Sequence, residues 1–177
     1  MGLEGNIREI YYSCFEKIIK QEVQFKKRKK NPPDNMVNTL ISFINTLIYT
    51  AVLSEIYHTQ LSPLISYLHE PGVRRFSLSL DIAEIFKPLI GDRLIFSLLN
   101  KKQITENDFK KELNFLYLKE NSRKIILKEF DERLKVKIKH KQLLKNVSYR
   151  YLIRLELYKL IKHFLDEKEY DGFKIWW

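Results

Sequence analysis

The sequence predicts an all-α protein, a multi-helix domain arranged around one central buried helix. Apolar residues recur at helical spacing along most of the chain, and no long stretch alternates with the period of a strand. Only five glycines and five prolines in 177 residues leave few places for tight turns, while a hydrophobic fraction of 45% can fill a core. We therefore expect a single helical domain over residues 1–177, with no strand required.

The first predicted helix covers residues 3–25. Its apolar stripe follows i, i+3, i+4 spacing and consists of Ile7, Ile10, Tyr11, Cys14, Phe15, Ile18 and Ile19. A run of cations follows it, made of Lys26, Lys27, Arg28, Lys29 and Lys30. The Asn-Pro-Pro sequence at 31–33 removes backbone donors, so we expect a basic loop there.

The central helix is predicted from Met36 to about Tyr57, with Asp34 or Asn35 as its cap. Its apolar residues lie on all sides, which is typical of a buried helix. Asn38, Asn45 and Glu55 interrupt this stretch, and we find no signal-peptide pattern. A single cysteine excludes an intramolecular disulfide. We therefore expect a soluble, cytoplasmic protein without a membrane segment.

Further helices are predicted in the second half of the chain. One begins near Leu78, and Pro88 should kink or break it close to Lys87. Thr105 and Asp108 have the spacing of a capping box that would open a helix over 106–118. Two more amphipathic helices are expected over roughly 120–138 and 140–167. The alternation of lysines with Val136 and Ile138 is interpreted as a helix end.

The net charge of +10 favours a polyanionic partner, and nucleic acid is the leading class. A membrane surface is the less favoured alternative. The basic run at 26–30 and the loop arginines Arg74 and Arg75 are the candidate phosphate contacts, and 135–145 is a third basic patch. For the basic run, a solvated linker without a specific partner is an equally good interpretation.

The chemistry must come from carboxylates and a histidine, because we find neither a glycine-rich phosphate loop nor zinc-ligand spacing. The candidates are Glu4, His69, Asp81 and Glu84. Asp81 and Glu84 lie three residues apart, so on one helix both carboxylates can approach a cation. The alternative is structural: Asp81 as an N-cap with Glu84 reaching back, His69 as a surface loop residue, and Glu4 as a helix-dipole residue.

Four blocks of the sequence resemble the CRISPR adaptation integrase family, the first and most widespread of the CRISPR-associated proteins. Glu4 to Tyr12 is similar to the Glu-Gly start of the family's catalytic helix, and Pro32-Pro33-Asp34 with Asn38, Leu40, Ser42 and Phe43 resembles its next block. Tyr67 to Glu70 resembles the histidine block. Phe76 to Pro88, with Asp92-Arg93 behind it, resembles the Asp, Glu, Phe, Arg, Pro and Asp-Arg signature.

The resemblance implies a metal-dependent DNA endonuclease and integrase of CRISPR spacer acquisition, which joins a DNA 3′-hydroxyl to the repeat. Glu4, His69 and Glu84 occupy the metal-ligand positions for Mg²⁺ or Mn²⁺, and Asp81 occupies the accompanying acidic position. Lys87 replaces the usual arginine, and Ile44-Asn45 replaces the usual Gly-Tyr. Lys87 and Arg93 join the candidate DNA contacts.

The resemblance also implies partners. These are double-stranded or branched DNA, a second copy in the full-length protein, and the small ferredoxin-like CRISPR adaptation protein. Family members carry a β-rich domain ahead of the Glu-Gly block, and this chain begins three residues before that block. The sequence is therefore interpreted as the helical catalytic domain without its β-rich partner domain.

Two other functions fit the composition. A non-catalytic helical nucleic-acid-binding module would explain the charge without using the acidic pair. A helical interaction or scaffold protein would use the aromatic tail of Phe173, Ile175, Trp176 and Trp177 as a docking surface, although the same tail could instead cover the core.

Overall fold

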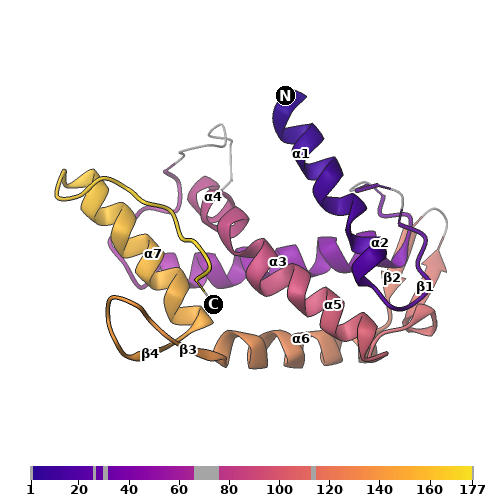
Figure 1. Cartoon of the computed structure of the whole chain (residues 1–177). Coiled ribbons are helices and arrows are strands. Elements are labelled where there is room, and N and C mark those ends of the chain that lie inside the picture. Colours follow the sequence, from indigo (N-terminus) through magenta and orange to yellow (C-terminus); the bar gives the residue numbers. More distant parts are fainter. Residues whose placement is uncertain (1, 26, 30–31, 66–75, 113–114, 177) are drawn as a thin grey trace. The chain divides into compact units, whose positions relative to one another are not determined.

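The structure is a computed structural model that describes residues 2–25, 27–29, 32–65, 76–112 and 115–176 (Figure 1). It is 59% helical and contains two small two-stranded sheets. The predicted helical class is therefore confirmed, but the expectation that no strand is needed was wrong.

The chain divides into two compact units. Unit 1 comprises Met1–Ile44 and Asp92–Glu129, and unit 2 comprises Asn45–Gly91 and Phe130–Trp177. The boundaries fall inside the helices α3 (Met36–Ile56), η1 (Lys87–Asp92) and α6 (Glu120–Lys135). These elements therefore contribute residues to both units, and the single domain over 1–177 stays a prediction.

Helix α3 confirms the predicted central helix, because its bounds agree with the sequence pattern to within one residue. Leu40, Ile44, Ile48, Val52 and Ile56 are fully buried along it. In the described part of the chain, α3 is the one helix long and apolar enough to cross a membrane. However, 56% of its most apolar window is buried inside the protein, as in the core helix of a soluble protein.

The first predicted helix was too long. Helix α1 (Gly2–Ser13) and the short α2 (Phe15–Ile18) end before Ile19, whose backbone is extended. The chain then turns back, which lets Phe25 pack on Phe15 with ring centroids 5.7 Å apart. The carboxylate of Glu16 accepts a hydrogen bond of 2.7 Å from the Phe25 amide and fixes this turn. Burial of Phe25 therefore outweighs the helical pattern of the segment.

Asn38 organises the segment before α3. Its side chain is fully buried, and its Oδ1 accepts a hydrogen bond of 3.0 Å from the amide of Lys29. Its Nδ2 donates to the carbonyl of Lys27 at 3.1 Å and to Asp34 Oδ1 at 2.9 Å. The predicted cap is Asn35, whose Oδ1 accepts from the Asn38 amide at 2.9 Å. One buried amide therefore fixes the basic loop against the first turn of α3.

The predicted helix over 106–118 was wrong. The capping box is present, since Asp108 accepts a hydrogen bond of 2.8 Å from the Thr105 amide, but it closes only the single turn η2 (Glu106–Asp108). The strands β1 (Phe109–Glu112) and β2 (Phe115–Leu118) follow as an antiparallel hairpin. Phe109 pairs with Leu118, and both side chains are buried. Hairpin pairing thus buries the two apolar ends of the segment together.

In unit 2, helix α4 (Ser77–Phe86) passes directly into η1, a π-helix, and α5 (Arg93–Asn100) follows in unit 1. Near Pro88, where a kink or break was predicted, the helix changes type at Lys87 but stays helical to Asn100, so a break there was wrong.

The predicted helices over 120–138 and 140–167 are shorter than expected, because a hairpin separates them. Helix α6 ends at Lys135, and α7 covers Tyr149–Phe164. Between them lie the antiparallel strands β3 (Lys137–Lys139) and β4 (Asn146–Ser148). The lysine alternation interpreted as a helix end is therefore a strand. Ile138 pairs with Val147, which is buried, so the period-2 pattern marks an apolar inner face.

Two buried carboxylates anchor helix α7 within unit 2. Glu55 is 1% exposed and accepts a hydrogen bond of 2.7 Å from Arg154 Nε, which raises the pKa of Arg154. Glu156 is equally buried and accepts from the Tyr170 hydroxyl at 2.6 Å and from the Phe173 amide at 2.9 Å. Burial of these charges is tolerated because each is paired and hydrogen-bonded.

The C-terminal segment covers part of the core of unit 2. Phe173 stacks on the buried Phe86 with ring centroids 5.3 Å apart. Trp176 contacts His140 edge-on, and its indole Nε1 donates to the carbonyl of Lys139 at 3.4 Å. Ile175 stays exposed, and Trp177 lies outside the described residues. Of the two interpretations of the tail, the structure favours covering the core for Phe173.

Replacing Asn38 by alanine should lower the free energy of unfolding by about 3 kcal/mol, because several buried backbone and side-chain groups lose their partner together. Urea denaturation at neutral pH measures this change. Asn121→Ala, on the exposed side of α6, is the matched control and should change stability by less than about 0.5 kcal/mol. Equal stabilities of the two variants would contradict the role of Asn38.

Asp108 should make stability depend on pH. Burial alone would raise the pKa of Asp108, but hydrogen bonds from Ser122 and Thr105 outweigh it and hold this pKa below its ordinary value. The stabilisation is then complete above the unfolded pKa of about 4 and is lost as pH falls through the folded pKa. Asp108→Asn should be less stable than the parent at pH 7 and approach it below about pH 4. Glu106→Gln in the same turn is the control, and a pH-independent difference for Asp108→Asn would contradict this assignment.

Candidate metal and nucleic-acid site

Two of the predicted catalytic residues lie on α4. Asp81 is the fifth residue of this helix, which begins at Ser77, so the alternative that Asp81 is an N-cap was wrong. Asp81 is only 5% exposed, and Glu84 lies one turn later with 30% of its side chain exposed. The pair therefore presents one buried and one accessible carboxylate on a common face of a regular helix.

Lys87 forms a hydrogen-bonded ion pair with Glu84. It is the first residue of η1, and its side chain is 22% exposed. An ammonium three residues after Glu84 offsets the repulsion between two carboxylates on neighbouring turns. The predicted contact of Lys87 with DNA stays a prediction. Its ion pair with the candidate metal ligand Glu84 was not predicted from the sequence.

The remaining candidate ligands are not described by the structure. Glu4 lies in α1, but its side chain is outside the described part, as is His69 with Arg74 and Arg75. Within the part of the chain that is described, no three His, Cys, Asp or Glu side chains group around a common point. Of the three predicted metal ligands only Glu84 is described, and its carboxylate, with that of Asp81 one turn before it, is the kind of hard oxygen donor that Mg²⁺ and Mn²⁺ prefer. The complete pocket stays a prediction.

A hydrogen bond within unit 1 joins two of the sequence blocks. The Tyr11 hydroxyl of α1 donates to Asp92 Oδ2 at 2.7 Å, and Asp92 is only 4% exposed. Burial, together with the neighbouring carboxylate, raises the pKa of Tyr11. Tyr11 had been assigned only to an apolar stripe. Its hydroxyl instead attaches the helix that carries Glu4 to the residue preceding Arg93.

The basic loop contains both structural and accessible cations. Arg28 donates to Asn38 Oδ1 at 3.0 Å and to Ser42 Oγ at 2.9 Å, and burial lowers its pKa. These contacts favour a structural role for Arg28. Lys29 lies 3.5 Å from Asp34, and Lys27 is exposed. Arg93 is also exposed at the start of α5, whereas Lys26 and Lys30 lie outside the described residues.

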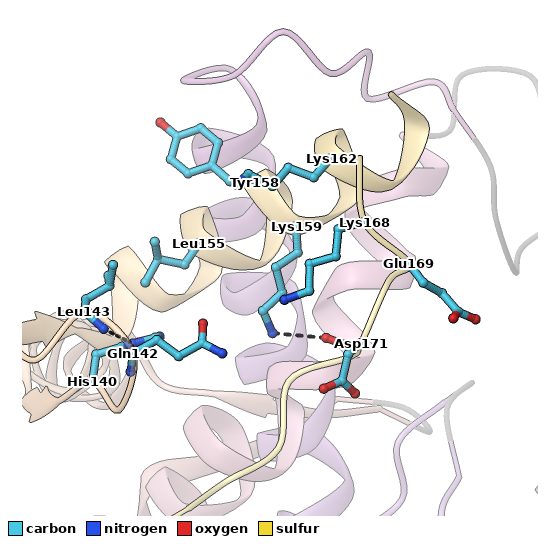
Figure 2. Close-up of a pocket in the computed structure, with 10 residues that line it drawn as sticks. All are labelled: His140, Gln142, Leu143, Leu155, Tyr158, Lys159, Lys162, Lys168, Glu169 and Asp171. Carbon is cyan, nitrogen blue, oxygen red and sulfur yellow. Dashed lines mark hydrogen bonds between the residues drawn. The ribbon is translucent and has the colours of Figure 1, made fainter. Parts of the chain in front are cut away.

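Unit 2 contains a pocket of about 230 Å³ next to the β3–β4 hairpin (Figure 2). Lys159 lines it and donates to the carbonyl of Asp171 at 3.1 Å, besides pairing with Glu156 at 2.9 Å. His140 Nδ1 accepts hydrogen bonds of 3.2 Å from the backbone amides of Gln142 and Leu143. This ring nitrogen therefore carries no proton. Burial, with the charge of Lys159, lowers the pKa of His140.

The lining of this pocket carries charges of both signs. Lys162 and Lys168 accompany Lys159, while Glu169 and Asp171 supply opposite charge (Figure 2). Hydrogen bonds to His140 close the hairpin turn, and the bond from Lys159 attaches Asp171 of the C-terminal segment to α7. These polar groups therefore have a structural role.

Comparison with known proteins gives the family. The profile of the family described as CRISPR associated protein Cas1 matches residues 1–132. This chain belongs to the Cas1 family. Over its whole length it is 64% identical to the CRISPR-associated endonuclease Cas1 of Fusobacterium nucleatum, and it covers 52% of that relative. Again over its whole length, it is 55% identical to the CRISPR-associated endonuclease Cas1 3 of Thermodesulfovibrio yellowstonii, and it covers 54% of that relative. The chain thus spans about half the length of these relatives.

Solved structures agree with the assignment. A Cas1 protein from Thermotoga maritima matches 94% of this chain and 52% of its own length, with a TM-score of 0.85 and 47% identity. A casposase bound to its integration product matches 95% of this chain and 48% of its own length, with a TM-score of 0.86 and 26% identity. A Cas6-RT-Cas1–Cas2 complex shares the fold, with a TM-score of 0.83 at 19% identity.

Replacing Tyr11 by phenylalanine should lower the free energy of unfolding by about 1–2 kcal/mol, because a buried carboxylate loses a charge-assisted hydrogen bond. Urea denaturation measures the loss. Tyr117→Phe, at an exposed ring on β2, removes the same hydroxyl as a control and should be neutral. If Tyr11→Phe is also neutral, the Tyr11–Asp92 bond does not attach α1.

Proposed function

We propose that this chain is the helical catalytic part of a divalent-metal-dependent DNA endonuclease and integrase that acts in CRISPR spacer acquisition. The observation that carries the proposal is the placement of Asp81 and Glu84 one turn apart on α4, inside the segment matched by the Cas1 family. The description of relatives as endonucleases supports nuclease activity. The casposase structure, which holds an integration product, supports strand transfer.

The proposed reaction is phosphodiester exchange. A DNA 3′-hydroxyl loses its proton and forms a new P–O bond with a repeat phosphate, while the P–O bond to the departing 3′ oxygen breaks and that oxygen takes up a proton. Water in place of the hydroxyl gives hydrolysis. A bound Mg²⁺ or Mn²⁺ would polarise the phosphate and lower the pKa of the attacking group.

The residues of the chain divide these tasks. Glu84, with Glu4 and His69, would hold the ion through two carboxylates and an imidazole. Asp81 would orient a ligand or accept a proton from its buried position on the same helix. Lys87 would neutralise Glu84 when no ion is bound, and then bind a DNA phosphate.

The proposed partners follow from the family. They are double-stranded or branched DNA, a second copy of the longer protein, and the small ferredoxin-like adaptation protein. The similarity to the Cas6-RT-Cas1–Cas2 complex is compatible with such an assembly but concerns the fold alone. A cytoplasmic location is proposed with these partners.

Replacing Glu84 by alanine should abolish Mn²⁺-dependent strand transfer on a branched DNA, a loss of at least about 100-fold, because a metal ligand is removed. The assay uses this chain and a chimera in which it replaces the matching half of the Fusobacterium nucleatum relative. Glu167→Ala, an exposed carboxylate after α7, should retain full activity.

Unchanged strand transfer by Glu84→Ala would refute the metal assignment. Binding of DNA by the parent chimera, with no metal-dependent transfer or cleavage, would instead favour the non-catalytic nucleic-acid-binding module.

A further inference from the structure

The cations of this chain concentrate in one segment. Residues 133–155 contain eight lysines and arginines and no aspartate or glutamate, compared with a net charge of +10 for the whole chain. The eight are Arg133, Lys135, Lys137, Lys139, Lys141, Lys145, Arg150 and Arg154. None of the candidate metal ligands lies in this segment, so binding of a metal ion does not explain this charge.

Some of these cations have partners inside unit 2. Arg154 and Arg150 contact the buried Glu55, and Lys135 pairs with Asp131 at 2.6 Å. Lys145 lies 5.8 Å from the centroid of the Tyr151 ring. These contacts give four of the eight cations a structural explanation.

Lys137, Lys139 and Lys141 differ from the others. All three are exposed, and no ion pair joins any of them to a carboxylate of the described residues. We call these three lysines the hairpin face. Three neighbouring ammonium groups without a carboxylate partner create a local positive potential, which attracts a polyanion.

The geometry of the hairpin suits a linear polyanion. Lys137 and Lys139 lie on the same side of β3, opposite Ser148 and Asn146 of β4, while Ile138 points to the apolar side. Residues two apart on a strand are separated by about 7 Å. This spacing is comparable to that of successive phosphates along one nucleic-acid strand, so neighbouring lysines can each meet a phosphate.

The hairpin is also held in place. The Tyr149 amide donates to the Val136 carbonyl at 3.0 Å, and the His140 amide donates to the Lys145 carbonyl at 2.9 Å. The indole of Trp176 donates to the carbonyl of Lys139, so the C-terminal segment supports the strand. A fixed backbone reduces the conformational entropy that is lost when the lysines bind a partner.

We propose that the hairpin face binds the phosphate backbone of nucleic acid, independently of base sequence and of divalent metal. The proposal rests on the proposed function in that both act on nucleic acid, but the hairpin holds none of the candidate metal ligands. Polar Asn146 and Ser148 flank the lysines, which favours phosphates over a membrane surface, where a broad apolar face is needed. The hairpin face thus adds a backbone contact to the cations already considered.

The test is the salt dependence of binding to a short fluorescein-labelled DNA duplex, measured by anisotropy in EDTA. The triple substitution Lys137→Gln, Lys139→Gln and Lys141→Gln should reduce the slope of log K against log salt by about two to three, and weaken binding at least about tenfold at low salt. The matched control is Lys101→Gln, Lys111→Gln and Lys128→Gln, three exposed lysines whose replacement changes the net charge equally. This control should keep the parent slope.

Circular dichroism checks that both triple variants are folded. An unaltered slope in the hairpin variant, or an equal decrease in the control, would overturn the proposal. Polyglutamate or anionic vesicles that displace the duplex at matched charge would assign the hairpin face to an acidic protein or a membrane instead. Strand transfer is measured in Mn²⁺ and backbone binding in EDTA, so failure of the proposed metal site and failure of the hairpin proposal are separate results.

Discussion

The structure depends on satisfying the polar groups that α3 carries into the core. On the buried face of a helix no water solvates a side chain, so each polar residue there needs a partner from the protein. Asn38, near the start of α3, binds the loop that precedes the helix in unit 1. Glu55, near its end, binds Arg154 of α7 in unit 2. The polar residues that interrupt an otherwise apolar helix are thus what attach the surrounding segments to it.

The same constraint explains the acidic pair on α4. Asp81 is buried in the interior of the helix, where a carboxylate is costly unless other groups stabilise it. Glu84 is partly accessible and already holds a cation, the ammonium of Lys87. Two carboxylates at this spacing favour a nearby positive charge in any state of the protein. A helix with this arrangement is suited to bind a divalent ion, and the proposed function uses that property.

Positive charge in this protein has two different uses. Arg28, Arg154 and Lys159 donate hydrogen bonds to carbonyls, amide oxygens or buried carboxylates. These cations stabilise the fold. The lysines of the hairpin face lie on β3 and in the turn after it, and no ion pair joins them to a carboxylate of the described residues. Counting cations in the sequence does not separate these classes, because the difference lies in the acceptors that folding brings to each side chain.

The sequence by itself determined the helical class, the central helix, an irregularity next to Pro88 and the family, because these depend on local spacing and on residues close together in the chain. Tertiary structure alone decided that 109–118 and 137–148 form hairpins, since pairing Phe109 with Leu118 and Ile138 with Val147 gains burial that a helical pattern does not reveal. It also decided that Tyr11 binds Asp92, 81 positions away. Hydrogen-bond partners depend on which surfaces meet, and local sequence leaves that choice open.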